Sequence, residues 1–155
     1  MADSKMDAIS LLKDDHKNVK QLFRDYEGLG DRAMQRRQGL YKKISTELEI
    51  HTMIEEEIFY PAAREADDEM VAEAIEEHNV VKRLLQELEG MDPSDERFDA
   101  KMTVVIENVE HHAEEEEQEM FPEVKKKIDT AQLSQLGAKM MDRKQQLMRQ
   151  LSAAA

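Results

Sequence analysis

Cysteine is absent from this chain of 155 residues. Its absence excludes disulfide bonds, iron–sulfur clusters and zinc sites built from thiolates, and it also excludes a cysteine nucleophile or a thiol redox switch. A metal site in this protein must therefore use nitrogen and oxygen ligands.

Glycine, proline and aromatic residues are scarce, with 5 Gly, 3 Pro and 5% aromatic residues, whereas 37% of the residues are charged. This composition is typical of a helical bundle and not of a sheet protein. The length fits one domain, which is large enough to bury a core without disulfide bonds.

Long apolar runs are lacking, and so are dense basic stretches before the C-terminal segment. No run approaches the roughly 20 residues of a membrane span, and residues 1–7 are too polar for a secretory signal. The net charge of -13 disfavours nucleic acid, because binding a polyanion requires a basic face, but it suits a cation. We expect a soluble cytoplasmic protein with no nucleic-acid or membrane partner.

Apolar residues recur every three or four positions in four long segments, as amphipathic helices require. These segments cover about residues 7–27, 31–66, 68–89 and 94–127, and Ser94 is placed to cap the last one. We therefore predict an all-α fold, in which residues 1–128 form an antiparallel up-down four-helix bundle. Residues 129–155 are expected to form a short amphipathic helix and tail that pack on the same domain, with a dimer contact as the second possibility.

An internal repeat divides the four predicted helices into two similar hairpins. Residues 15–22 parallel residues 77–84, and residues 51–61 parallel residues 112–122. Packing the two hairpins face to face gives a bundle with approximate two-fold symmetry.

Six polar side chains interrupt the apolar stripes of these helices. A His and a Glu four residues apart lie one helical turn above each other, so they can close on one ion or bridge two. Each predicted hairpin supplies one such pair and one further His. We predict that the six side chains converge as metal ligands in the core: His16, His51, Glu55, His78, His112 and Glu116.

Four imidazoles and two carboxylates are too many for one tetrahedral zinc ion, but they match two metal ions. Iron is favoured because carboxylate-rich sites inside helical bundles are typical of non-haem di-iron proteins. If both glutamates bridge, each ion receives two nitrogens and two oxygens, and a bridging oxide or hydroxide completes five ligands. The predicted cofactor is therefore two iron ions with a bridging oxide or hydroxide, with a sixth position left for dioxygen, peroxide, nitric oxide or water.

The order His, HxxxE, His, HxxxE on four helices, with the tails IFYP and EMFP, resembles the hemerythrin-like (HHE) cation-binding domain over about residues 10–125. The resemblance implies a di-iron site made of the six residues named above. It also implies binding or sensing of oxygen, iron, nitric oxide or peroxide, and catalase-like activity in some members.

The sequence also differs from the oxygen-carrying members that it resembles. They have an additional His one turn from the third-helix ligand, where this chain has Ala74 and Lys82, so reaction is favoured over reversible oxygen carriage. They place the last acid five residues after its His, at Glu117 here. The internal repeat instead favours Glu116 as the counterpart of Glu55, with Glu117 as the alternative.

Other residues near the pattern have simpler interpretations. His111 lies off the apolar stripe and is expected to face solvent, although a shift of register would exchange His111 and Glu115 for His112 and Glu116. We expect Tyr60 to close the end of the bundle by packing, and a redox role is the less favoured alternative.

We therefore predict a non-haem di-iron protein that reacts with dioxygen or hydrogen peroxide, with catalase-like disproportionation of peroxide as the leading reaction. One alternative is a non-catalytic sensor or binding module for oxygen, nitric oxide or iron. The other is a helical interaction protein with a structural zinc ion. The protein is expected to be a monomer or a homodimer.

Overall fold

The described part of the chain is helical. The computed structural model describes residues 6–30 and 33–154, and no strand occurs in these two ranges. None of the helices in them combines the length and apolar character that crossing a membrane requires. The elements, with η marking a π-helical turn, are α1 (Ala8–Glu27), α2 (Met34–Ile54), η1 (Glu55–Phe59), α3 (Tyr60–Ala63), α4 (Asp68–Glu89), α5 (Glu96–Glu115), η2 (Glu116–Met120), α6 (Phe121–Lys127) and α7 (Thr130–Ala154).

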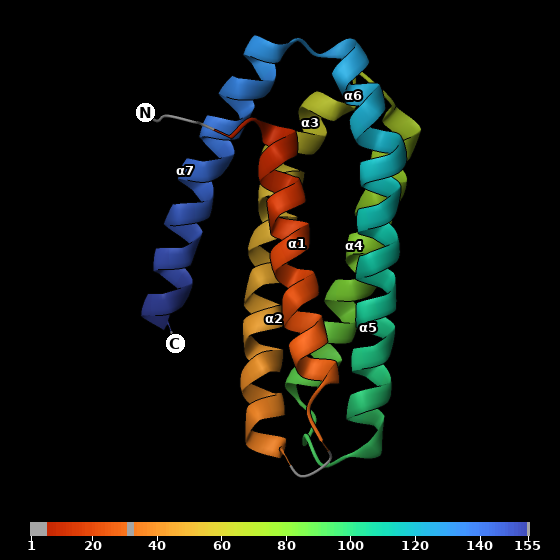
Figure 1. The fold of residues 1–155 in the computed structure, drawn as a ribbon, viewed down its shortest axis with the longest axis vertical. Helices are drawn as coiled ribbons and strands as arrows, with labels where there is room; N and C mark the ends of the chain where they lie inside the picture. The colour runs from red at the N-terminus through yellow and green to blue at the C-terminus, as the bar shows by residue number, and fades with distance from the viewer. Residues whose placement is uncertain (1–5, 31–32, 155) are drawn as a thin grey trace.

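The described helices form rods that run up and down the molecule (Figure 1). α1 is antiparallel to the rod formed by α2, η1 and α3, and α4 is antiparallel to the rod formed by α5, η2 and α6. α1 contacts α2 and α5, while α4 contacts the same two helices, so these four rods surround one interior. The predicted all-α helical bundle is confirmed.

Two details of the predicted helix ends differ in the structure. The predicted cap at Ser94 is wrong, because α5 begins at Glu96 and the side chain of Asp95 accepts the N–H of Arg97 at 2.9 Å. The backbone and hydroxyl groups of Ser94 instead donate to the carboxylate of Asp92, so this hydroxyl is already used in the preceding turn. The predicted start of the second helix at residue 31 lies outside the described residues.

The C-terminal helix is longer than the short helix that we predicted. α7 covers 25 residues and packs on α1, α2 and η1, outside the four central rods (Figure 1). Its side chains Leu133, Met140 and Leu147 are buried in the core. Gly137 allows the close approach, because a Cβ atom at this position would lie 2.8 Å from the Cα atom of Asp7.

Two apolar clusters fill the interior, and a polar layer separates them. Along α1, Ile9 and Leu12 belong to the cluster near α3, α6 and α7, whereas Val19 and Phe23 belong to the cluster near the opposite end. His16 lies between them and is also buried. The core therefore contains polar groups at one level of the bundle, where they require partners.

Candidate metal centre

The six predicted ligand residues meet in this polar layer. Their side chains are almost completely removed from solvent, with exposed fractions of 0% for Glu55, 1% for Glu116 and at most 12% for the four histidines. Each comes from a different element: His16 from α1, His51 from α2, Glu55 from η1, His78 from α4, His112 from α5 and Glu116 from η2.

Both glutamates begin a π-helical turn. In each turn, the N–H of the residue five positions after the glutamate bonds to the carbonyl oxygen of that glutamate. A proline follows in both cases, at Pro61 and Pro122, where its ring does not fit against a regular α-helical turn and the wider turn accommodates it. Because π turns are frequent at functional sites, their presence at both glutamates marks this layer as a candidate site.

His16 and His51 form the first half of the site together with both glutamates. One ligand atom from each of the four residues lies within 4.8 Å of the others. Nε2 of His16 is 3.1 Å from Glu116 Oε1, and Nε2 of His51 is 3.3 Å from Glu55 Oε1. These contacts are not aligned as hydrogen bonds, and four buried atoms have no partner: His16 Nε2, His51 Nε2, Glu55 Oε2 and Glu116 Oε1.

Such unpartnered atoms are costly, because each loses its hydrogen bonds to water on burial. The cost is about 1–3 kcal/mol for each atom, and it is higher for a charged group. A cation between these atoms would remove the cost, since two lone-pair nitrogens and two carboxylate oxygens are suitable ligands for a transition metal.

His78 and His112 form the second half of the site. Their ligand atoms lie within 4.8 Å of one another and of an oxygen of Glu55. Nε2 of His78 is 3.0 Å from Glu55 Oε1, and Nε2 of His112 is 3.4 Å from Glu116 Oε2. Each glutamate therefore reaches one histidine in each half, as a bridging carboxylate does.

Tyr60 also enters the second half, and its predicted role as a packing residue at the bundle end is incomplete. Its ring is 1% exposed and stacks on His78 with centroids 5.3 Å apart. Its hydroxyl group lies 2.6 Å from Glu116 Oε2, 3.1 Å from Glu55 Oε1, and 3.1 Å from His112 Nε2. The internal repeat contains the signal for this role, because the equivalent position in the other hairpin is Phe121, which has no hydroxyl.

In every predicted histidine ligand, Nε2 faces the centre of the layer and the other ring nitrogen, Nδ1, faces a carboxylate. The Nδ1 contacts are His16 with Glu117 at 2.7 Å, His51 with Asp15 at 3.1 Å, His78 with Glu56 at 2.7 Å, and His112 with Glu77 at 2.6 Å. An ionised carboxylate can only accept, so Nδ1 carries the hydrogen and Nε2 is the atom left to bind a metal. Carboxylates in this position orient metal-binding histidines and make them better ligands.

Sequence reasoning missed these four acids as a group, although the repeat contains them. Asp15 and Glu77 directly precede the first histidine of their hairpins, and each contacts the second histidine of the same hairpin. Glu56 and Glu117 directly follow the candidate bridging glutamates, and each contacts the first histidine of the other hairpin. The contacts are therefore repeated in both halves.

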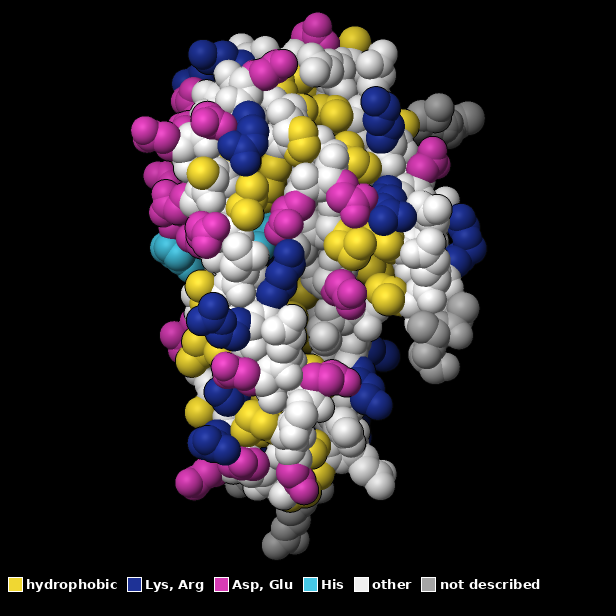
Figure 2. All heavy atoms as spheres, turned by 180° about the vertical axis from the view of Figure 1, so that it is seen from behind, with side chains coloured by type: hydrophobic (Ala, Val, Ile, Leu, Met, Phe, Trp, Pro, Cys, Tyr) yellow, Lys and Arg dark blue, Asp and Glu magenta, His cyan; other side chains and the backbone are white. Residues whose placement is uncertain are grey.

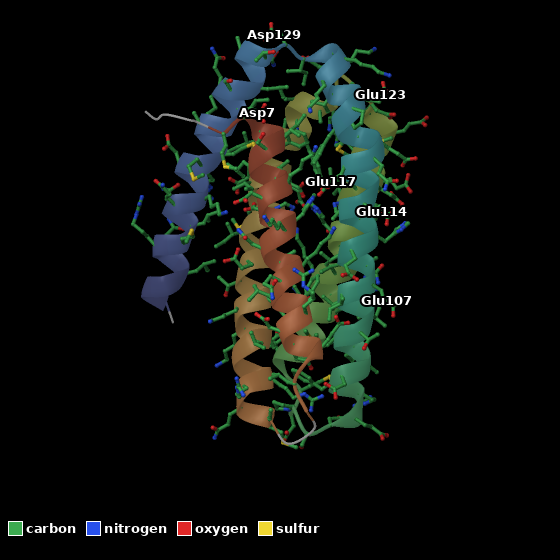
Figure 3. The ribbon with its side chains drawn as sticks, viewed as in Figure 1. Asp7, Glu107, Glu114, Glu117, Glu123 and Asp129 are labelled. Carbon is green, nitrogen blue, oxygen red and sulfur yellow. The ribbon has the colours of Figure 1, made fainter. Side chains whose placement is uncertain are left out.

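The structure also decides between the two registers considered for α5. His111 points outwards with 67% of its side chain exposed, whereas His112 and Glu116 face the interior. Glu117, the alternative to Glu116, lies between its own helix and α1, where it contacts His16 Nδ1 and not Nε2 (Figure 3). Glu114 is exposed on the outer side.

The imidazoles and carboxylates of the layer shift each other's proton affinity. Burial alone would lower the pKa of His51, but Glu55 and Asp15 outweigh it and raise this pKa to about 10. Burial is likewise outweighed at His112, where Glu116 and Glu77 raise the pKa to about 11. A metal ion that binds these histidines must therefore displace protons at neutral pH.

A small cavity adjoins the histidines on the side of the second apolar cluster. Its volume is about 30 Å³, and apolar side chains form much of its wall: Val19, Leu48, Val81 and Val109. All four predicted histidine ligands also line it. A cavity of this size holds a water molecule or a small diatomic or triatomic molecule directly beside the candidate site.

Comparisons with known proteins place this chain among cation-binding domains. Residues 7–124 match the sequence profile of the hemerythrin HHE cation binding domain. The crystal structure of a hemerythrin HHE cation binding domain-containing protein from Mycobacterium kansasii, a homolog of Rv2633c, is similar with a TM-score of 0.80 and 32% sequence identity, over 92% of this chain and 87% of that chain.

Two curated relatives extend the comparison. The uncharacterized protein Rv2633c of Mycobacterium tuberculosis is 32% identical over 146 residues, which cover 92% of this chain and 88% of that protein. A DNA nickase from Nostoc is 25% identical over 97% of this chain, but the chain spans only 42% of the length of the nickase.

Proposed function

Because the chain belongs to the hemerythrin HHE cation binding domain family, we propose that its buried His/Glu layer binds two iron ions. His16 and His51 would hold one ion, and His78 and His112 would hold the other. Glu55 and Glu116 would contribute to both, because each glutamate lies within 3.4 Å of one histidine from each half. The observation that carries this proposal is the set of four buried, unpartnered ligand atoms in the first half of the site.

The donor set fits two iron ions better than one zinc ion. A structural zinc site is filled by four ligands and commonly uses thiolates, which this chain lacks. Six inward-facing donors with bridging carboxylates are instead typical of di-iron sites in helical bundles. The carboxylates at the four Nδ1 atoms support this role, because they hold each imidazole in a fixed orientation.

The proposed activity is reaction with dioxygen or hydrogen peroxide, and catalase-like disproportionation of peroxide is the leading reaction. Bound iron would supply reversible electron transfer and Lewis acidity. The chain supplies the pocket, because the cavity beside the histidines admits a small molecule while Val19, Leu48, Val81 and Val109 limit access of bulk water. Nitric oxide also fits this volume.

Tyr60 is the nearest hydroxyl donor to the proposed site of reaction. Burial and the two neighbouring glutamates raise its pKa well above the usual value, so the phenol keeps its proton. Its oxygen lies near Nε2 of His78. One helical turn on either side of His78, this chain has Ala74 and Lys82 and so no additional histidine. Tyr60 can therefore hold a proton beside a bound ligand.

The second candidate function is a sensor or binding module, and a contact between α7 and the site favours it. Lys144 of α7 is bonded to Asp15, which in turn contacts His51. A change at His51 on ligand binding could be transmitted to the surface through this path. Both functions use the same metal centre.

Metal analysis of protein purified without added metal tests the centre. We expect close to two irons per chain, with a charge-transfer band in the near ultraviolet. A single zinc ion without such a band overturns the proposal. In a second step, peroxide is added in an oxygen electrode: release of oxygen with turnover supports catalysis, whereas a spectral change without turnover supports sensing.

A variant tests the assignment of the second half. His78→Ala removes one of its nitrogen ligands and should reduce the iron content to about one ion per chain or less. Asn79→Ala is the matched control, because this neighbour is exposed on the same helix. Full iron content in His78→Ala would show that His78 is not a ligand.

A further inference from the structure

A third group of metal-ligating side chains lies at the surface, outside the buried layer. Nε2 of His111 is 2.5 Å from Glu115 Oε1, one turn later on α5, and Glu77 from α4 completes the group. One ligand atom from each residue lies within 4.8 Å of the others. We propose that this group, the outer triad, binds a divalent transition-metal ion and delivers it to the buried centre.

The chemistry of the outer triad matches such an ion. His111 and Glu115 have the same four-residue spacing as the two His/Glu pairs of the buried layer. One imidazole and two carboxylates suit Fe²⁺, Mn²⁺, Co²⁺ or Zn²⁺, whereas Ca²⁺ and Mg²⁺ prefer oxygen ligands alone. Three protein ligands leave positions for water, so an ion can arrive and leave without losing its whole hydration shell.

The surroundings of the outer triad attract cations. Among the described residues, no Lys or Arg forms an ion pair with Glu77 or Glu115. The chain is acidic overall, with a net charge of -13, and Figure 2 shows many acidic side chains on one face of the molecule. Their negative potential raises the local concentration of metal ions.

The outer triad is also adjacent to the buried layer. Glu77 bonds to Nδ1 of His112, and Glu115 directly precedes Glu116 in the chain. A second, smaller cavity of about 10 Å³ lies between α4 and the α5–η2 rod, and its lining includes all four of these residues. The remaining wall is formed by Met70, Ala74 and Met120.

This cavity brings two members of the outer triad next to two buried ligands, because Glu77 and Glu115 line it together with His112 and Glu116. The wall of the larger cavity includes Val19, Leu48, Val81 and Val109, beside which a hydrated cation loses solvation. In the proposed delivery step, cations therefore enter on the side of α4 and α5. The delivery step rests on the proposed function, but binding to the outer triad does not.

Titration of metal-free protein with Co²⁺ by calorimetry tests the outer triad. We expect three ions per chain in the wild type and two in both His111→Ala and Glu115→Gln. Glu114→Gln is the matched control, because it removes an exposed charge from the same helix without touching the triad. Equal numbers of ions in wild type and His111→Ala would overturn the site. If the buried centre itself binds no metal, the wild type takes up one ion and His111→Ala none.

The rate of filling tests delivery. At a low Co²⁺ concentration, the buried centre of His111→Ala should fill roughly tenfold more slowly than that of the wild type, while its final content is unchanged. The visible absorption of bound Co²⁺ reports the filling. Equal rates for His111→Ala, Glu114→Gln and wild type would overturn the delivery step.

Discussion

Nζ of Lys144 lies 2.5 Å from Oδ1 of Asp15, and Oδ2 of the same carboxylate lies 3.1 Å from Nδ1 of His51. Lys144 belongs to α7, whereas Asp15 and His51 belong to the four central rods. A helix outside the family match at residues 7–124 is therefore connected to the proposed metal centre through one buried carboxylate. The other three carboxylates at Nδ1 atoms have no contact with α7 among the described hydrogen bonds.

Lys144→Met should destabilise the protein, because it keeps the length of the side chain but leaves the carboxylate of Asp15 with one partner fewer in a buried position. Asp15 is 6% exposed and its pKa is lowered, since His51 and Lys144 outweigh the effect of burial. We expect the free energy of unfolding to fall by about 1–3 kcal/mol in urea titrations. Lys139→Met, at an exposed position of α7, is the control, and an equal result for both variants would contradict the proposed role of the contact.

Glu117→Gln should weaken metal binding without removing a ligand. The amide no longer provides a negative charge to His16 Nδ1, so the histidine becomes a poorer ligand and its orientation is less well fixed. The affinity for Co²⁺ should fall by roughly 10- to 100-fold in competition with a chelator. Glu114→Gln, three residues before Glu117 and facing outwards, should bind Co²⁺ as the wild type does.

Tyr60→Phe should change the metal centre more than the stability. The substitution removes the hydroxyl group that contacts Glu55 and Glu116. It also makes the two hairpins alike, because the residue equivalent to Tyr60 in the second hairpin is Phe121. Tyr41→Phe is the control, since it removes a part-buried hydroxyl bonded to Glu89, away from the centre. Both variants should lose about 1 kcal/mol of stability, but only Tyr60→Phe should alter the visible spectrum of the Co²⁺ form. Identical spectra would show that Tyr60 only packs.

Metal binding should release protons and should strengthen as the pH rises. His51 and His112 have pKa values of about 10 and about 11 in the metal-free protein, so both are protonated at pH 7 and must each give up a proton to bind a metal. If two protons are released, the apparent affinity should rise roughly 100-fold for each pH unit near neutrality. Calorimetry in buffers of different ionisation enthalpy measures the release, and a pH-independent affinity would contradict it.

The same two groups set the pH dependence of stability in the metal-free protein. Their folded pKa values lie above the ordinary value of 6.5, so their protonated forms stabilise the fold fully below pH 6.5. This contribution is lost as the pH rises through about 10 and about 11. We expect unfolding midpoints of the metal-free protein to fall across this alkaline range, and the decrease should be smaller for His51→Gln.

The sequence by itself determined the helical bundle and the six residues that meet in its polar layer. Apolar spacing within a helix is local information, and a His and a Glu four residues apart share one helix face wherever the helix is packed. The repeat of the two hairpins then identified Glu116 and not Glu117 as the predicted ligand. The apolar stripe that contains Val109 likewise identified His112 and not His111.

Only the tertiary structure decided the partners of these residues. Asp15, Glu56, Glu77 and Glu117 contact histidines on other helices, and such contacts depend on how far neighbouring helices are shifted along each other. A π turn adds a residue to one turn and changes the direction of the side chains that follow, so the inward position of Tyr60 could not be read from a regular helical period. The contact of Lys144 with Asp15 joins residues 129 positions apart, and it exists only because α7 packs back onto α1.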